Sequence, residues 1–553
     1  MAEKTSNTEK NFLIQGSILA IAGVITRVIG AVYRIPLVNI LGDTGMGYYG
    51  VAFQIYSIAL TLTSYSLPLA VSKLVSARLA KKEYKNANRI FRGALTFAIV
   101  VAGIVAMIVF FGADFIATNI MAMSFSSIAL RVLAPCILIV ALLGVLRGFF
   151  QGNDTMIPTA VSQVIEQIIN AVVSIVGAYT LIRVGANLAR STGEGAYEYA
   201  YAAAGGTLGT VIGALAGLAF LIFLFILFRR GFRRKMRHDR DTHAESYGQV
   251  YKVLLATIAP ILLSATVYNL CGVLDNALFG QIMSMQGFAE SEYAPLLGIL
   301  SGKYDVLVNV PLAFSSALAA SLMPNIVSVV QTGTKKEVYR QIDTFNRFDM
   351  VISIPCAVGL IVLAKPILDL LFYTENNSLG AVLLEIGAIS VIFYNLSTVS
   401  NAVLQGMDDM MTPVVSAAIA MGIHVVVLVI LMVVFHGGIY AVVVSKIVFA
   451  ASASLLNAWA LHRKTGYVQE MRRTFAIPAI AAAIMGVITV GVYFFLSLFI
   501  PTRLATVIAI LIAVVVYAVA IVLLGGISEE EMLGFPRGAT LVRICKKLHL
   551  LKG

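Results

Sequence analysis

Apolar residues occur in long runs along this chain, separated by short segments with charged residues or clusters of Gly, Pro and Asn. A run of about 20 apolar residues is long enough to cross a bilayer as a helix. The longest runs exceed this length, so we expect them to tilt, bend or extend into the cytoplasm, with Pro68 as one bending point. The pattern predicts an all-α polytopic membrane protein with fourteen spans, near residues 12–38, 46–80, 90–118, 124–149, 157–184, 200–228, 251–284, 294–331, 347–373, 378–405, 412–436, 437–462, 476–500 and 502–527.

Charge adds an orientation to these spans. Only 12% of the 553 residues are charged, whereas a soluble domain carries about 25%. If the N-terminus is cytoplasmic, 30 of the 40 Lys and Arg residues fall in cytoplasmic segments and three in external loops. This asymmetry follows the positive-inside rule and predicts that both termini are cytoplasmic. The net charge of +12 therefore reflects membrane topology, and we expect no nucleic-acid partner.

The chain also repeats itself. The Lys-Lys-Glu sequence at 81–83 returns at 335–337, and the Gln-Gly-Asn-Asp sequence at 151–154 returns with one change at 405–408, both at an offset of 254 residues. Two matches at one offset indicate a duplication, and six spans in each copy give two parallel repeats. The predicted organisation is an N-terminal six-helix lobe at 1–228, a basic cytoplasmic linker at 229–250, a C-terminal six-helix lobe at 251–462, and two additional helices with a basic tail at 463–553.

The first span contains two arginines, Arg27 and Arg34, seven residues apart. Helical geometry places them on one face, with Gly23 and Gly30 about 40° away around the same helix. An arginine at mid-bilayer costs roughly 2.5–3.5 kcal/mol on insertion scales. We therefore expect a polar cavity between the lobes, where these arginines meet an anionic group. The alternative for Arg34 is that it reaches the headgroups from the end of the span.

Few other ionisable residues lie inside the predicted spans, so each is a candidate. Lys73 lies near a cytoplasmic end and either joins the cavity or reaches water. Lys303 and Asp305 point about 200° apart on a helix, so they cannot pair with each other. A lone intramembrane carboxylate is either a coupling site for a proton or cation, or the partner of a buried arginine. The candidates for coupling or structural ion pairs are Glu166, Asp275, Glu385 and His424.

Motifs of enzymes are missing from the sequence. The segment 298–304 resembles a P-loop, but it has three residues between its glycines and a Tyr in place of the magnesium-binding Ser or Thr. The four cysteines show no metal-ligand spacing and no disulfide framework, so we predict no metal site. The prediction is a non-enzymatic transporter without a cofactor, driven by the membrane potential or by a gradient of H⁺ or Na⁺.

The chain resembles the multidrug/oligosaccharidyl-lipid/polysaccharide (MOP) exporter superfamily along its whole length. The resemblance rests on the six-plus-six repeat with two extra helices, on the first-span motif Thr26-Arg27-Val-Ile-Gly30 followed by Arg34, and on Tyr304-Asp305-x-Leu307-x-x-x-Pro311. It is closest to the lipid II flippases and the stage V sporulation protein B branch. In lipid II flippases an arginine tends to follow the residue matched by Asp305, whereas Val306 stands here.

The resemblance implies a flippase in a bacterial cytoplasmic membrane. It would move an undecaprenyl-pyrophosphate-linked saccharide, lipid II in particular, to the outer leaflet by alternating access, with membrane lipids and cell-wall synthesis proteins as further partners. Arg27 and Arg34 match the arginines that engage the pyrophosphate, while Lys73, Lys303 and Asp305 would complete the cavity. The residues leave two alternatives: a cation-coupled multidrug antiporter of the same superfamily, and a non-transporting scaffold for cell-wall or spore assembly.

Overall fold

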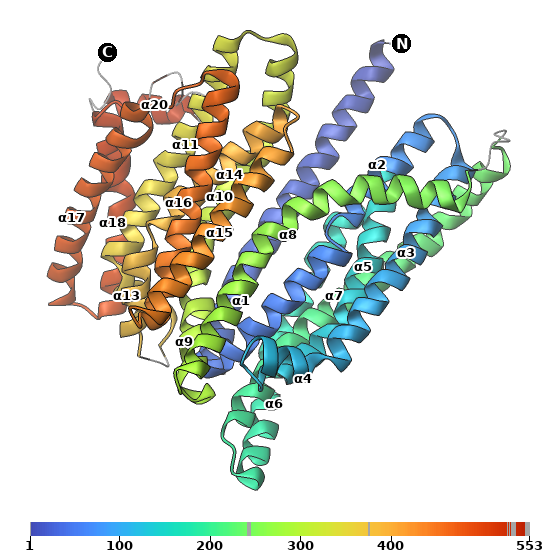
Figure 1. Ribbon diagram of the computed structural model, residues 1–553. Coiled ribbons are helices and arrows are strands. Elements are labelled where there is room, and N and C mark those ends of the chain that lie inside the picture. The colour runs from blue at the N-terminus through green and yellow to red at the C-terminus, as the bar shows by residue number, and fades with distance from the viewer. Residues whose placement is uncertain are drawn as a thin grey trace. The chain divides into compact units, whose positions relative to one another are not determined.

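A computed structural model describes residues 2–239, 245–373, 376–527, 529, 531 and 538–547. Within these residues the chain forms helices and no strands, which confirms the all-α prediction (Figure 1). The chain divides into two compact units, Met1–Gly302 and Lys303–Gly553, called here the N-terminal and C-terminal units. The lobe boundaries predicted from the repeat stay a prediction.

The N-terminal unit begins with a 62-residue helix, α1, that bends at Gly42, where φ is 65° and ψ is 178°. Only glycine adopts this backbone conformation readily, so Gly42 lets two predicted spans follow one another without a loop. The second of them stops at residue 63, and a new helix starts next to Pro68, as expected for a bending point. The elements are α1 (Ala2–Thr63), α2 (Leu67–Ala80), α3 (Tyr84–Phe111), α4 (Ala113–Phe115), η1 (Ile116–Ile120), α5 (Ser126–Gly152), α6 (Ile157–Thr192), α7 (Ala196–Arg237), α8 (Tyr247–Met285) and α9 (Glu290–Ile299).

Glycines set the helix spacing in this unit. A Cβ atom on Gly205 of α7 would lie 2.2 Å from the carbonyl oxygen of Gly177 on α6, and one on Gly298 of α9 would lie 1.7 Å from that of Asp43 on α1. Small residues allow such close approach between membrane helices, where packing replaces the hydrophobic driving force. The α6–α7 hairpin extends past the neighbouring helix ends of its unit in Figure 1, since its helices of 36 and 42 residues exceed the bilayer thickness.

The C-terminal unit is built around α11, which packs against α10, α14 and α17. Met350, Ile354, Leu396 and Ala482 form part of the buried core between these helices. The two helices after the predicted repeat, α17 and α18, pack on each other and expose large apolar side chains such as Val487. The elements are η2 (Leu300–Tyr304), which joins the units, α10 (Asp305–Thr332), α11 (Lys335–Val362), α12 (Ala364–Leu371), α13 (Ser378–Gly387), α14 (Ser390–Gly406), α15 (Met411–Val433), α16 (Gly438–Thr465), η3 (Arg472–Ala476), α17 (Ile477–Ser497), α18 (Thr502–Leu523) and α20 (Gly538–Lys547).

Eleven helices of the described residues are long and apolar enough to cross a membrane, or twelve if α13 and α14, bent by 46°, form one span. One of the eleven, Ile21–Ala80, contains two predicted spans joined through the bend in α1. The span predicted at 251–284 coincides with α8, several of whose side chains lie outside the described residues. The chain is a multi-pass membrane protein, while the number fourteen is not confirmed.

The repeated segments 151–154 and 405–408 adopt the same turn. Asp154 and Asp408 both have positive φ, 57° and 62°. In both turns the three backbone N–H groups from the third residue onward donate to matching carbonyl oxygens, for example Thr155 to Phe150 and Asp409 to Leu404. The other match differs, because α3 begins after the Lys-Lys-Glu sequence whereas α11 begins with it.

Candidate functional site

The two arginines of α1 have different surroundings. Arg27 is exposed, whereas Arg34, two turns later, is half-buried next to Tyr49. The Nε of Arg34 is buried and receives no acceptor among the residues that the structure describes. Gly30 lies against Gln167 of α6, with 3.2 Å between its ideal Cβ position and the amide nitrogen. Arg34 therefore carries an unused donor, the feature that an oxyanion ligand would satisfy.

A buried polar layer on α6 lies beside this part of α1. Asn170 donates a hydrogen bond from Nδ2 to the hydroxyl of Tyr33, at 3.3 Å. Ser174 donates to the side-chain oxygen of Asn170 and to the carbonyl of Gly206 on α7, at 3.0 and 2.8 Å. Since each of these groups has a hydrogen-bond partner inside the unit, the layer fixes the position of α1 against α6 and α7.

Glu166 on α6 has a partner in the same unit. Arg147 on α5 donates to its carboxylate at 2.7 Å, and donates from Nε to the hydroxyl of Ser162 at 3.0 Å. This geometry is that of a structural ion pair. It matches the second of the two roles that the sequence leaves open for Glu166, that of the partner of a buried arginine. The count of charged residues along the sequence assigns Arg147 to a cytoplasmic segment. Its proximity to α6 is a result of the fold and could not be predicted from the sequence.

Arg147 also lines a cavity of about 300 Å³ in the N-terminal unit. The cavity lies between α1, α2, α5 and α8, and its wall includes Ser57, Thr61, Ser64 and Asn269 in addition to apolar residues. The guanidinium of Arg147, paired with Glu166, therefore lies at the edge of a cavity whose wall is mostly apolar.

The second-lobe candidates lie where η2 meets α10. Lys303 is fully buried. Asp305 accepts a hydrogen bond from Lys446 of α16 at 2.8 Å, so it meets a neighbouring helix and not Lys303, as the helical spacing predicts. The Lys446 ammonium lies 5.7 Å from the ring centre of Tyr304. The π-helical turn at Leu300–Tyr304 interrupts the regular spacing at this point, a feature frequent at functional sites.

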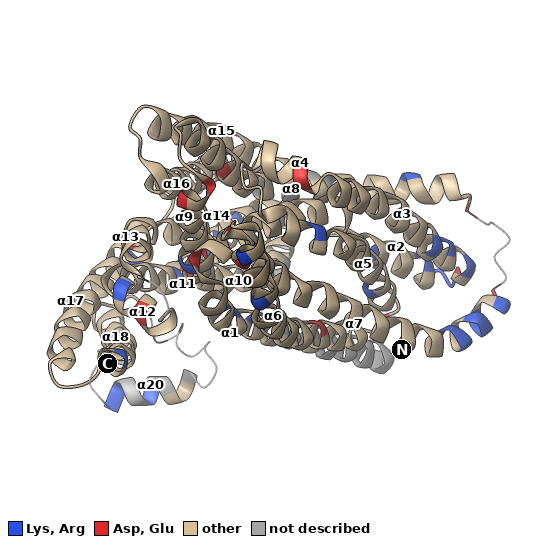
Figure 2. Ribbon diagram, turned by 90° about the horizontal axis from the view of Figure 1, so that it is seen from below, with Lys and Arg blue, Asp and Glu red and all other residues tan. Residues whose placement is uncertain are grey.

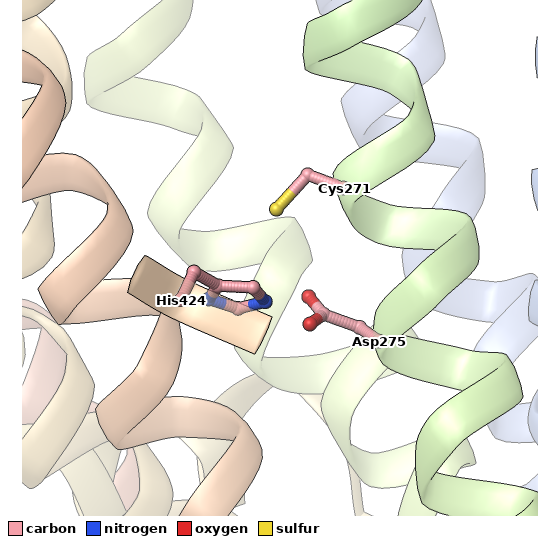
Figure 3. A group of neighbouring side chains, drawn as sticks. All are labelled: Cys271, Asp275 and His424. Atoms are coloured by element: carbon pink, nitrogen blue, oxygen red, sulfur yellow. The ribbon is translucent and has the colours of Figure 1, made fainter. Parts of the chain in front are cut away.

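The remaining candidates are spread over both units. Lys73 on α2 and Glu385 on α13 are exposed. Asp275 is buried on α8, one turn after Cys271, and both side chains point to the same side of the helix (Figure 3). His424 on α15 is buried, and its Nδ1 lies 2.8 Å from the carbonyl oxygen of Ser445 on α16. The roles assigned to these residues from the sequence stay predictions.

Charge outside the spans is concentrated in a few segments. Figure 2 shows long uncharged stretches of helix, with basic residues on α20 among the exceptions. At the end of α7, a hollow of about 530 Å³ is lined by basic residues of the α2–α3 turn and of the predicted linker. The backbone N–H of Lys85 donates to Asp239 at 2.8 Å and holds the linker to this turn.

Sequence reasoning missed one more buried carboxylate, Asp349 of α11. Asp349 is fully buried in the structure. The signal for this position was a polar stripe, since Asn346 and Ser353 share its helix face at spacings of three and four residues.

Comparison with protein families and curated proteins gives consistent results. A family model described as "Polysaccharide biosynthesis protein" matches residues 13–330, and a model described as "MatE" matches residues 306–430. The chain is 27% identical over 524 residues to the lipid II flippase MurJ of Bacillus subtilis, covering 92% of this chain and 93% of that protein. It is also 27% identical over 419 residues to stage V sporulation protein B of Bacillus subtilis, covering 75% of this chain and 77% of that protein.

Solved structures show the same fold at low sequence identity. An inward-facing multidrug resistance MATE family transporter of the MOP superfamily aligns with a TM-score of 0.63 at 14% identity, covering 82% of this chain and 98% of that one. The lipid II flippase MurJ in an inward closed conformation aligns with a TM-score of 0.62 at 14% identity, covering 91% and 97%.

Proposed function

The chain belongs to the polysaccharide biosynthesis protein family, within the MOP exporter superfamily, and from this premise we propose that it is a flippase for an undecaprenyl-pyrophosphate-linked saccharide. As a MOP-family transporter it is not an enzyme. The specific substrate of the proposal is lipid II, moved from the inner to the outer leaflet of the bacterial cytoplasmic membrane by alternating access. The membrane potential, H⁺ or Na⁺ supplies the driving force, and both termini face the cytoplasm.

The observation that carries the proposal is the state of Arg34. Its Nε is buried without an acceptor among the described residues, and Arg27 stands on the same face of α1. A buried donor left unsatisfied costs about 1–3 kcal/mol, more when it is charged. A pyrophosphate oxygen is a strong acceptor, and the guanidinium fork suits its geometry. The similarity to a lipid II flippase over 92% of this chain supports the same substrate class.

In the C-terminal unit, Lys446 and Lys303 are less available to an anionic ligand than the arginines of α1 are. Asp305 neutralises Lys446, so this pair presents little net charge to an anionic ligand. Lys303 is buried at the start of the unit and is the second-lobe contact that we assign to the pyrophosphate. The function therefore rests mainly on α1.

Transport in proteoliposomes tests the proposal. Fluorescent lipid II is incorporated in both leaflets together with the purified protein, and a membrane-impermeant reagent reports the fraction that moves between leaflets. We expect movement of lipid II, a loss of at least about 10-fold in Arg34→Ala, equivalent to about 1.4 kcal/mol, and partial retention in Arg34→Lys. Arg190→Ala, an exposed arginine at the end of α6, is the matched control. No movement of lipid II or of other pyrophosphate-linked polyprenyl sugars by the wild-type protein would overturn the proposal.

A second candidate function, a cation-coupled drug antiporter, is favoured by the MatE match at residues 306–430 and by the fold of the MATE transporter. Such a transporter needs an available carboxylate for its organic cations. Glu166 is instead paired with Arg147. Efflux of a cationic dye from the same proteoliposomes distinguishes the two functions, and we expect a dye efflux rate no higher than that of protein-free vesicles.

A further inference from the structure

The predicted cytoplasmic end of α7 carries a group of basic side chains that the proposed transport function does not use. They line the hollow of about 530 Å³ in the N-terminal unit, between the end of α7 and the turn that joins α2 to α3. A volume of this size accommodates a small molecule or the headgroup of a lipid. The basic residues of the hollow are Lys81 and Lys82 from the turn, and Arg234 and Lys235 from α7.

The positive charge of this hollow has no counter-charge among the described residues. All four basic side chains are exposed, and none donates a hydrogen bond to, or forms an ion pair with, a residue that the structure describes. The acidic residue of the lining, Asp239, accepts a hydrogen bond from the backbone N–H of Lys85 at 2.8 Å. Glu83 and Glu245 lie 3.6 and 2.6 Å from Arg78, which neutralises them. The hollow therefore has a net positive charge that an anionic ligand would balance.

The walls of the hollow are held in place by packing. Helix α7 continues past Arg234 and Lys235, so both side chains start from a regular helix and not from a loop. Phe232 is buried, and its ring contacts Tyr84 of α3 and Phe149 of α5 edge-on, with centroids 6.2 and 5.4 Å apart. The Lys235 ammonium lies 5.9 Å from the ring centre of Tyr84. A site whose backbone is fixed before the ligand arrives loses less entropy on binding.

The position of the hollow along α7 favours a lipid over a soluble anion. Phe223 and Leu227 are 59% and 57% exposed, as expected for side chains in contact with acyl chains. Arg234 follows Leu227 by seven residues, so it lies on the same helix face and about 10 Å further along the axis. The headgroup layer extends roughly 5–8 Å beyond each side of the hydrocarbon core, and the long side chain of an arginine reaches it. One face of α7 thus passes from an apolar surface to a basic one.

We propose that this hollow binds the headgroup of a membrane lipid that carries two phosphate groups. Four cations in one hollow match a headgroup with two or more negative charges better than a single phosphodiester, and basic pockets on the cytoplasmic side of membrane helices bind such headgroups. Two kinds of lipid have this chemistry: a phospholipid with two phosphodiesters, and a polyprenyl pyrophosphate. Binding of the phospholipid is independent of the transported molecule, whereas binding of the polyprenyl lipid rests on the proposed function.

The test measures lipid binding to the purified full-length protein in a neutral detergent. The protein is titrated into fluorescent cardiolipin, a phospholipid with two phosphodiesters, and fluorescence anisotropy reports the bound fraction. We expect unlabelled cardiolipin to displace the probe at least about 5-fold better than phosphatidylglycerol, which has one phosphodiester. Phosphatidylcholine, which has no net charge, should not displace it. The affinity for cardiolipin should fall as the salt concentration rises, because salt screens exposed charges.

Variants locate the binding site. The double variant Arg234→Gln, Lys235→Gln should weaken cardiolipin binding about 25-fold, or about 5-fold for each charge removed. Lys81→Gln removes one charge from the opposite wall and should weaken binding about 5-fold. The matched control is the double variant Arg233→Gln, Arg237→Gln, which makes the same change of charge at exposed positions of α7 outside the hollow. It should weaken binding less than about 2-fold at physiological salt, because the charges are screened there.

Competition between unlabelled lipids identifies the occupant. Stronger displacement by undecaprenyl pyrophosphate than by cardiolipin assigns the hollow to a polyprenyl lipid, and the reverse order assigns it to a phospholipid; both orders support the site. The binding assay contains no transport step, so the two proposals fail separately. Cardiolipin binding at the hollow of a protein that does not move lipid II would refute the proposed function and leave this site standing.

The proposal would be overturned by any of three results. The wild-type protein could bind cardiolipin no more tightly than phosphatidylglycerol. The control pair on α7 could weaken binding as much as the pair in the hollow, which would show that the basic residues act only through general charge and membrane topology. Soluble inorganic pyrophosphate could displace the probe as well as cardiolipin does, which would show that the site does not recognise a lipid.

Discussion

An arginine side chain inside a membrane costs free energy, and the two arginines of α1 differ in how far their side chains are buried. Arg27 keeps its side chain exposed, while Arg34 is half-buried with an unsatisfied Nε. Their spacing of seven residues was visible in the sequence, because helical periodicity depends only on residue number. Their surroundings were not, since the proximity of Arg34 to Tyr49 depends on how distant segments pack.

Removing the charge of Arg27 should abolish transport. We expect Arg27→Ala to fail in complementing a strain depleted of its lipid II flippase while inserting into the membrane at normal levels. Arg27→Lys should retain partial activity, because the charge survives while the bidentate geometry is lost. Arg190→Ala is again the control. Full activity of Arg27→Ala would contradict the pyrophosphate role.

The pair of Arg147 and Glu166 should contribute to stability. Its atoms are 2.7 Å apart, and the side chain of Arg147 is 14% exposed. We expect Glu166→Gln to lower the free energy of unfolding by roughly 1.5–3 kcal/mol, because a hydrogen bond to a charged group is lost and the guanidinium remains without its counter-charge. Thermal unfolding in detergent measures this, with exposed Glu194→Gln as the control. Adding Arg147→Met should cost less than the sum of the two single changes, and simple additivity would show that the pair is not coupled.

At the scale of helices, the sequence predicted which helices exist more accurately than it predicted where each helix begins and ends. The apolar runs predicted the positions of helices correctly along most of the chain. This was possible because the hydrophobicity of a run of about 20 residues depends only on the local sequence. They separated two spans that α1 joins through the bend at Gly42, and they merged α1 and α2 across residues 64–66. The glycine contacts between α1 and α9 could not be predicted, because nothing in a single sequence shows which helices become neighbours.

The close approach of α9 to α1 predicts a sharp difference between two glycines. Gly298→Ala should strongly reduce the amount of folded protein, because its Cβ would lie 1.7 Å from the carbonyl oxygen of Asp43. Gly23→Ala should be tolerated, because a Cβ there meets no described atom within 4 Å. Fluorescence-detected size-exclusion chromatography of both variants measures folded yield. Equal yields would show that α9 is free to shift away from α1.

Glu470 precedes the first of the two additional helices and should make their stability depend on pH. Burial raises the pKa of this carboxyl, but hydrogen bonds from the backbone N–H groups of Arg473 and Thr474 outweigh that effect and lower the pKa below its ordinary value. The stabilisation is therefore present above the unfolded-state pKa, near 4.3, and is lost as the pH falls through the lower folded-state pKa. We expect Glu470→Gln to lower the unfolding temperature at pH 6.5, with the difference from the wild type shrinking below pH 4. Exposed Glu194→Gln is the control, and a difference that does not change with pH would exclude the carboxylate as its cause.

At the scale of the whole molecule, the repeat was inferred from two short sequence matches. Only one of these two matches has the same local structure in both copies. The turns after α5 and α14 share backbone conformation and hydrogen bonds, since Asp154 and Asp408 occupy the same left-handed position. The Lys-Lys-Glu match lies outside α3 but inside α11, where Thr334 forms the cap. A turn is specified by its own few residues, and a helix start depends on the cap before it. The burial of Asp349 was missed for a similar reason, because a sequence does not show which helices cover a position.

The orientation of the chain in the membrane is a prediction at this largest scale. It rests on the 30 Lys and Arg residues of the proposed cytoplasmic segments against three in external loops. Single cysteines introduced into an active cysteine-free protein test it through a membrane-impermeant maleimide added to intact cells. Ser191→Cys, exposed at the end of α6, should be labelled at once, whereas Thr334→Cys, exposed before α11, should be labelled only after permeabilisation. Because six spans per repeat give both copies one orientation, a single reversed position would contradict the parallel repeat together with the topology. Labelling of Thr334→Cys from outside, with protection of Ser191→Cys, would invert the membrane orientation and place the Arg27 end of α1 in the wrong leaflet to receive a substrate made in the cytoplasm.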